Sequence, residues 1–81
     1  MTDTQLWTTL VGVFRSTFNR DSIDVSAETT AADIQEWDSL NHVHLILAVE
    51  SEFKIRFKHS EVASFENVGN MVAALKRHLN L

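Results

Sequence analysis

Residues 38–53 read DSLNHVHLILAVESEF, and this stretch decides the fold because its apolar residues recur with the period of a helix. The pattern predicts a helix from Ser39 to Phe53, with Asp38 placed to cap its first turn. Such a helix is stable only when other elements cover its apolar side. The apolar face is predicted to comprise Leu40, Val43, Ile46, Leu47, Val49 and Phe53.

Two more long helices are predicted, one on each side of this stretch. A helix from about Thr4 to Phe18 follows from apolar residues at every fourth position, with Asn19 placed to end it. Asn67 is expected to cap a last helix, and residues 60–64 are expected to form a short helical turn. The apolar faces are Leu6, Leu10, Phe14 and Phe18 in the first helix, and Val68, Met71, Val72, Leu75 and Leu79 in the last.

The predicted fold class is all-α, a small four-helix bundle of three long helices and one short helix. A long polar loop from Asn19 to Glu36 is expected to join the first two long helices, pinned to the core by Ile23, Val25 and Ile34. Ile55 and Phe57 are expected in an extended link, since no second strand is available to pair with them. Three residues are predicted to meet at the centre of the bundle: Phe14, Leu47 and Leu75. Further core positions are predicted at Val43, Ile46, Val62, Phe65 and Met71.

Length and composition exclude several classes of protein. A chain of 81 residues has room for one modest core, so we expect one domain over residues 1–81 and no deep enclosed active site. The chain has no cysteine, which excludes disulfides and thiolate metal sites and fits a reducing cytoplasm. Residues 1–4 lack the features of a leader, and no apolar run approaches the ~20 residues that span a bilayer. We expect a cytoplasmic monomer without membrane insertion.

The charge is distributed unevenly along the chain. Eight of the 11 acidic residues lie between Asp21 and Phe53, and none of the seven Lys and Arg residues does. Such an anionic region disfavours nucleic acid as a partner and steers association with basic protein surfaces. The alternative is that it is only a solvated face.

These features together resemble the acyl carrier protein family over nearly the whole chain. The triplet Asp38-Ser39-Leu40 looks like the family's attachment triplet, and Asn67-Val68-Gly69 after Phe65 resembles the entry to its last helix. The length, the helix pattern and the acidic region agree with this resemblance. Five residues occupy places where that family carries its usual residues in and just after the second helix: Leu45, Ala48, Glu50, Phe53 and Ile55.

The resemblance implies a carrier and not an enzyme. It implies a 4'-phosphopantetheine arm joined to the Ser39 side-chain oxygen, added from coenzyme A by a phosphopantetheinyl transferase that Asp38 and Leu40 help to engage. The arm would carry acyl intermediates as thioesters between acyl-loading and acyl-processing enzymes of fatty acid, polyketide or another specialised synthesis. The free N–H groups and dipole of a helix N-terminus independently favour a phosphate at Ser39.

Partner enzymes are expected to dock electrostatically along the predicted second helix, through Glu36, Asp38, Glu50 and Glu52. Trp37 is expected either to pack on the core or to contact a partner enzyme or the arm. Asn41 and His44 stand where acids are common in fatty acid carriers, which favours a carrier in a specialised pathway. The residues assigned to partner binding are Glu36, Trp37, Asn41, Val43, His44, Glu50 and Glu52.

Four alternatives use the same residues differently. A peptidyl or aminoacyl carrier would use the Ser39 arm for an amino acid, and an unmodified interaction module would keep the fold and ignore Ser39. A hydrolase built on Ser39 and His42 would lack both a Gly-x-Ser-x-Gly elbow and an oxyanion hole. A histidine metal site is disfavoured because His42 and His44, two residues apart, face different sides of a helix.

Overall fold

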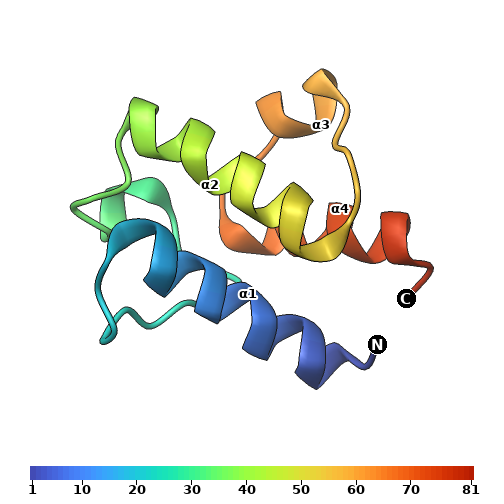
Figure 1. The fold of residues 1–81 in the computed structure, drawn as a ribbon. Coiled ribbons are helices and arrows are strands. Elements are labelled where there is room, and N and C mark those ends of the chain that lie inside the picture. The colour runs from blue at the N-terminus through green and yellow to red at the C-terminus, as the bar shows by residue number, and fades with distance from the viewer.

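The structure is a computed structural model that describes residues 1–81, and it is entirely helical. The confirmed all-α class has three long helices and one short one, and no strand forms around Ile55 and Phe57. A one-turn 3-10 helix that the sequence did not predict lies in the connection between the first two long helices. The elements are α1 (Asp3–Phe18), η1 (Ala31–Asp33), α2 (Ser39–Phe53), α3 (His59–Ala63) and α4 (Val68–Leu79) (Figure 1).

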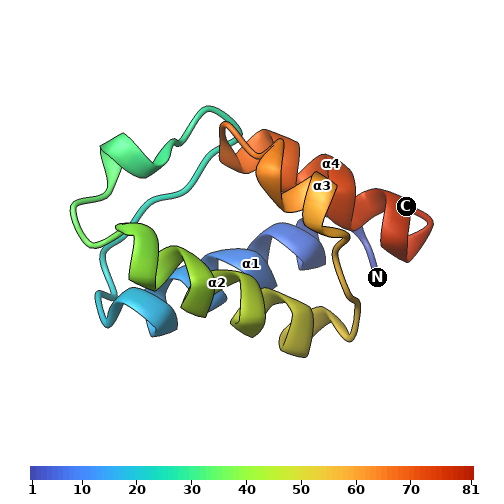
Figure 2. The same ribbon diagram turned by 90° about the horizontal axis from the view of Figure 1, so that it is seen from above.

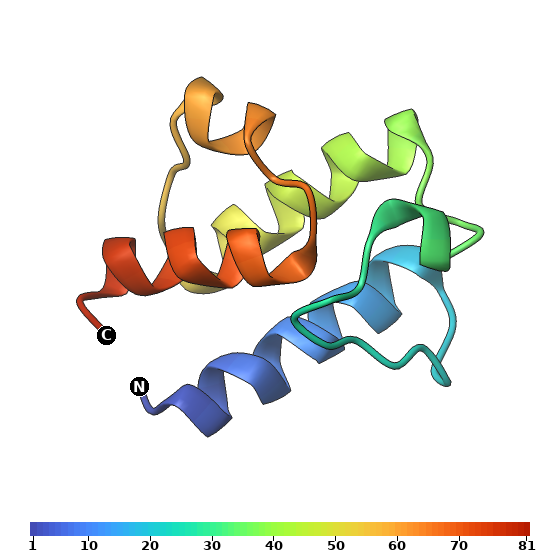
Figure 3. The same cartoon turned by 180° about the vertical axis from the view of Figure 1, so that it is seen from behind.

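Helices α1 and α2 lie side by side and run in opposite directions (Figure 1). Seen from above, α1 and α2 lie on one side of the bundle and α4 lies on the other, with the short α3 next to α4 (Figure 2). The view from behind shows the connection with η1 gathered at the end of the bundle where α2 begins (Figure 3). Both chain termini lie at the opposite end, where Lys76 Nζ and Asp3 Oδ1 are 2.6 Å apart.

Side-chain caps fix where the long helices begin. Asp38 Oδ1 accepts a hydrogen bond from the Asn41 N–H at 2.8 Å, as predicted, and Asn67 Oδ1 caps α4 in the same way. Thr2 and Gln5 form a reciprocal capping box, so α1 begins at Asp3. Each of these helices ends at a left-handed residue, a conformation that stops the helix: Asn19, Lys54 and Asn80.

A single cluster of buried side chains holds the helices together. The predicted apolar faces of α1 and α4 are confirmed, apart from Leu79, which is partly buried against the cluster. From the link after α2, Phe57 is buried and Ile55 is partly buried. The cluster comprises Leu6, Leu10, Val13, Phe14, Phe18, Ile23, Ile34, Trp37, Leu45, Val49, Phe53, Phe57, Val68, Met71, Val72, Ala74 and Leu75.

The predicted apolar face of α2 is partly wrong. Leu40, Val43 and Leu47 are 67%, 54% and 59% exposed, so Leu47 does not meet Phe14 and Leu75 at the centre of the bundle. Val49 and Phe53 are buried as predicted, and with Leu45, which was not predicted, they recur every fourth residue on the opposite side. The error has a simple cause: α2 is apolar at every position from 45 to 49, and periodicity alone cannot choose among faces of such a helix.

The connection between α1 and α2 is anchored to α4. Ile23 and Ile34 are buried, as predicted, and Val25 is half-buried. In addition, the Val68 and Gly69 N–H groups donate to the Thr29 and Ala27 carbonyls, both at 2.8 Å. These bonds satisfy two of the free donors in the first turn of α4.

The link between α2 and α4 is held by Glu50. Its Oε2 atom accepts a hydrogen bond from the Phe57 N–H at 2.8 Å, and the Phe57 ring packs edge-on against Phe65. The α3 residue Glu61 accepts from the Lys58 N–H at 2.8 Å and lies 3.0 Å from His78 Nε2 of α4.

None of the helices has both the length and the apolar character that a membrane-spanning helix needs.

The burial pattern predicts which core truncations destabilise the fold. Phe14→Ala and Leu45→Ala should each cost ~2–5 kcal/mol in the free energy of unfolding, because each leaves a cavity in the cluster. Leu47→Ala is the matched control on α2 and should change stability by no more than ~0.5 kcal/mol. Urea denaturation of the three variants measures the difference. A large loss for Leu47→Ala with none for Leu45→Ala would show that α2 is rotated relative to this structure.

Candidate functional site: the exposed serine at the start of α2

Ser39 is the first residue of α2 and is exposed at one end of the bundle. Because Asp38 caps the helix, the Ser39 hydroxyl is not needed for capping. The backbone N–H groups of Ser39 and Leu40 donate to no protein acceptor. The free hydroxyl therefore lies beside two unpaired donors at the positive end of the helix dipole.

The preceding residue, Trp37, is fixed in the core. The residue is only 9% exposed, and its ring packs edge-on against Phe14 at a centroid distance of 5.3 Å. It also lies 6.1 Å from the Phe18 ring. The structure thus supports the core placement of Trp37 and leaves little of its ring for a partner.

Trp37 also reaches forward to the first turn of α2. Its indole N–H donates to His42 Nδ1 at 2.9 Å. The two ring planes differ by 19° and the ring centroids are 6.0 Å apart, so the rings are offset and meet at their nitrogen edges. This bond orients the His42 imidazole beside Ser39.

Two further polar contacts close the loop before α2. Asn41 Nδ2 donates to the Glu36 carbonyl at 2.8 Å, and Arg20 donates to the Glu36 carboxylate at 2.8 Å. Mainly because of the Arg20 hydrogen bond, the pKa of Glu36 is lowered from its ordinary value. Asn41 and Glu36, both assigned to partner binding, therefore also stabilise the loop.

An open hollow of about 440 Å³ adjoins Ser39. Its lining residues are Ala31, Trp37, Asp38, Ser39 and His42. A narrower cleft of about 60 Å³ shares Ala31, Trp37 and His42 with the hollow and reaches Phe65 and Met71. The two spaces together run from Ser39 toward the start of α4.

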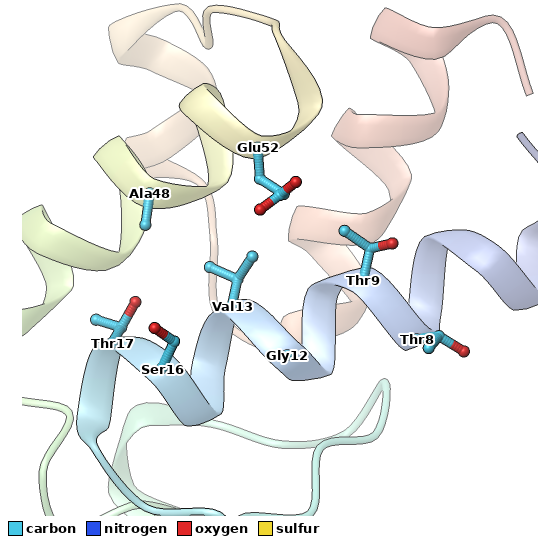
Figure 4. Close-up of a pocket in the computed structure, with 8 residues that line it drawn as sticks. All are labelled: Thr8, Thr9, Gly12, Val13, Ser16, Thr17, Ala48 and Glu52. Atoms are coloured by element: carbon cyan, nitrogen blue, oxygen red, sulfur yellow. The ribbon is translucent and has the colours of Figure 1, made fainter.

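A separate groove of about 340 Å³ lies between α1 and α2 and does not include Ser39 (Figure 4). Half of its eight lining residues are Thr or Ser from α1, and Glu52 extends into it from α2 (Figure 4). Glu52 is its only ionisable residue, so the groove offers no pair of groups for acid–base chemistry.

The exposed surface of α2 is apolar near Ser39. We define the exposed stripe as Leu40, Val43 and Leu47, which share one side of the helix. The exposed His44 lies beside it. The acids assigned to partner binding on α2 are not part of the stripe, since Glu50 binds the Phe57 N–H and Glu52 lines the groove.

The enzyme and metal alternatives find no support in the geometry. No hydrogen bond joins Ser39 to His42, whose Nδ1 is occupied by Trp37. No three His, Asp or Glu side chains gather into a metal-binding group. Ser39 therefore lies exposed beside an open hollow and not in an enclosed catalytic site.

Comparisons with known proteins define the family. No family model matches the chain. An acyl carrier protein from Petrotoga mobilis is 30% identical over 81 residues, covering 100% of this chain and 95% of that protein. One from Clostridium acetobutylicum is 34% identical over 58 residues, covering 72% of this chain and 75% of that protein.

A solved structure agrees with these relatives. The holo acyl carrier protein from Geobacter metallireducens, determined in solution by NMR, superposes with a TM-score of 0.85 and 38% sequence identity. The match covers 90% of this chain and 84% of that one. The chain belongs to the acyl carrier protein family, whose members are carriers and not enzymes.

Two features of the site were missed in the sequence. The link from Trp37 to His42 has a weak signal, an aromatic donor just before a helix and a histidine five residues later. The cleft beside the hollow has no signal in the sequence, because its lining residues Ala31 and Met71 come from segments far apart in the chain.

The Arg20 contact predicts a measurable change in the titration of Glu36. Arg20→Met should raise the pKa of Glu36 toward its ordinary value of 4.5, because it removes the donor that favours the carboxylate. Carbon-detected NMR titration of the Glu36 carboxyl measures this shift. Arg56→Met, which removes a cation that forms no ion pair, is the control and should leave the titration unchanged.

The same contact predicts the direction of one pH effect on stability. A carboxyl whose pKa is lower in the folded state stabilises the fold above its unfolded pKa, and this contribution is lost as the pH falls through the folded value. The wild type should therefore lose more stability than Arg20→Met on acidification below about pH 4.5. Equal losses in the two proteins would show that the Arg20 contact does not persist in solution.

Proposed function

We propose that Ser39 carries a 4'-phosphopantetheine arm and that this chain holds acyl intermediates on it as thioesters. The observation that supports this most directly is the exposed Ser39 hydroxyl at a helix start already capped by Asp38, on the fold of a carrier family. The name of the Geobacter relative, a holo acyl carrier protein, agrees with the proposal.

The residues around Ser39 fit such a group. A phosphodiester on the Ser39 oxygen would lie at the positive end of the α2 dipole, close to the unpaired Leu40 N–H. The hollow lined by Trp37 and His42 has room for the first part of the arm. When attached, the arm supplies the thiol that this cysteine-free chain lacks.

The size of the cleft bears on the cargo. The cleft has a volume of about 60 Å³, well below the ~150 Å³ of a dry cavity that accepts a benzene molecule. We infer that a long acyl chain is not enclosed in this conformation. The volume does not separate acyl cargo from an aminoacyl cargo, the second candidate, which is distinguished by the activating enzyme that loads the arm.

We further propose that the transferase and the acyl-handling enzymes dock on the exposed stripe in the cytoplasm. Leu40, Val43 and Leu47 offer an apolar surface that begins one residue after the modified serine. His44 and Asn41 flank this surface and would select among partners. Asp38 adds negative charge near Ser39, whereas the positions of Glu50 and Glu52 give them a smaller part in docking.

The attachment site has a direct test. Incubation with a phosphopantetheinyl transferase and coenzyme A should raise the intact mass by one phosphopantetheinyl group, and Ser39→Ala should abolish that gain. Ser39→Ala should change the free energy of unfolding by no more than ~0.5 kcal/mol, measured by thermal unfolding, because Asp38 and not Ser39 caps the helix. Ser60→Ala, which alters another exposed serine, is the control and should accept the group normally. Modification that persists in Ser39→Ala would overturn the assignment.

The docking surface has a separate test. Val43→Ser and Leu47→Ser should each lower kcat/KM of the transferase reaction about tenfold, the equivalent of ~1.4 kcal/mol of lost apolar contact. Both side chains are exposed, so circular dichroism and the melting temperature should stay close to wild type. Glu52→Gln is the control on the same helix and should have little effect. If the loss instead follows Glu52→Gln and disappears at high salt, docking depends on the acids.

A further inference from the structure

His42 has one hydrogen-bonding group that the fold does not use. An indole N–H can only donate, so His42 Nδ1 accepts the bond from Trp37 and carries no proton. The imidazole proton is then on Nε2. Nε2 forms no hydrogen bond within the protein, although the residue is half-buried.

The orientation of this N–H is determined by the core. The Trp37 ring is held by Phe14 at 5.3 Å and Phe18 at 6.1 Å, and its Nε1 atom holds His42 at 2.9 Å. A free histidine at the same place could rotate and exchange its two nitrogens. Here the contact with the buried indole fixes both the tautomer and the ring position.

The free N–H lies next to the proposed attachment point. Ser39 and His42 are three residues apart on α2, a spacing that places their Cβ atoms about 5–6 Å apart. Both side chains also line the same hollow. A phosphate group on the Ser39 oxygen would therefore lie within reach of a donor on the His42 ring and of the unpaired Leu40 N–H.

We propose that His42 is a positioning residue for the phosphodiester on Ser39, donating its Nε2–H to a phosphate oxygen. This inference rests on the proposed attachment at Ser39. A hydrogen bond to an anionic oxygen is shorter and stronger than one between neutral groups. This hydrogen bond would hold the phosphate end of the arm over the hollow and define the direction in which the arm leaves the bundle. The Trp37 indole acts through His42 and does not contact the phosphate.

NMR of the whole chain tests this directly. The imidazole nitrogens and the phosphorus are recorded before and after conversion with a transferase and coenzyme A. The His42 Nδ1 resonance should remain that of an acceptor in both forms, while the Nε2 resonance should shift when the phosphodiester forms. An Nε2 resonance that does not respond to conversion overturns the proposal, even when the mass gain is complete.

Two substitutions of His42 separate positioning from folding. His42→Asn keeps an acceptor for Trp37 near the place of Nδ1 and removes the Nε2 donor. His42→Gln places an amide donor near the position of Nε2. In the holo protein, His42→Asn should move the phosphorus resonance to that of a short phosphopantetheinyl-serine peptide, and His42→Gln should partly restore the wild-type value. His44→Asn changes a neighbouring exposed histidine and should leave the resonance unchanged.

The outcomes distinguish this inference from the proposed function. A full mass gain with the same phosphorus resonance in wild type and His42→Asn would overturn the role of His42 and leave the attachment at Ser39 intact. No mass gain in the wild type would overturn the attachment itself, and the positioning role with it. The wild-type Nε2 measurement does not depend on whether His42→Asn folds.

Discussion

The packing of Trp37 against Phe14 and Phe18 is the interaction on which the functional end of the molecule depends. A loop that leaves α1 and returns to start α2 must be fixed close to its last residue if the helix is to begin at a defined place. Trp37 provides that fixed point one residue before the Asp38 cap, because its large ring is buried between the helices. Its indole N–H then aligns the first turn of α2 through His42. Core packing and site geometry are thus connected by one side chain.

The rest of this end of the bundle is held by contacts between segments far apart in the sequence. The carbonyls of Ala27 and Thr29 cap the N–H groups of Gly69 and Val68, so the connection and α4 support each other. This close approach explains the glycine: a Cβ atom at position 69 would lie 2.9 Å from the Ala27 carbonyl oxygen. A larger residue would push the connection away from α4. Because the connection also contributes Ala31 and Trp37, such a shift would reach the hollow beside Ser39.

Helix α2 meets several demands on its different sides. One side buries Leu45, Val49 and Phe53, and the opposite side leaves the exposed stripe in water. Leaving three large apolar side chains exposed does not stabilise an isolated chain, and a contiguous patch of this kind is typical of a surface that is covered when a partner binds. A carrier has no enclosed site of its own, so the groups that perform chemistry on its cargo must come from its partner enzymes.

Several properties of this protein follow from its sequence alone, because they depend on neighbouring residues. These are the helical class, the cap at Asp38, the helix end at Asn19, and Ser39 as an exposed serine at a helix start. Tertiary structure alone decided which side of α2 is buried, since residues 45–49 are all apolar and the choice depends on where α1 lies. It also decided that Glu50 holds the link at Phe57, that Glu52 faces α1, and that Trp37 orients His42. Each of these depends on a contact with a partner that local sequence does not specify, and the placement of the site's surroundings therefore comes from the packed core.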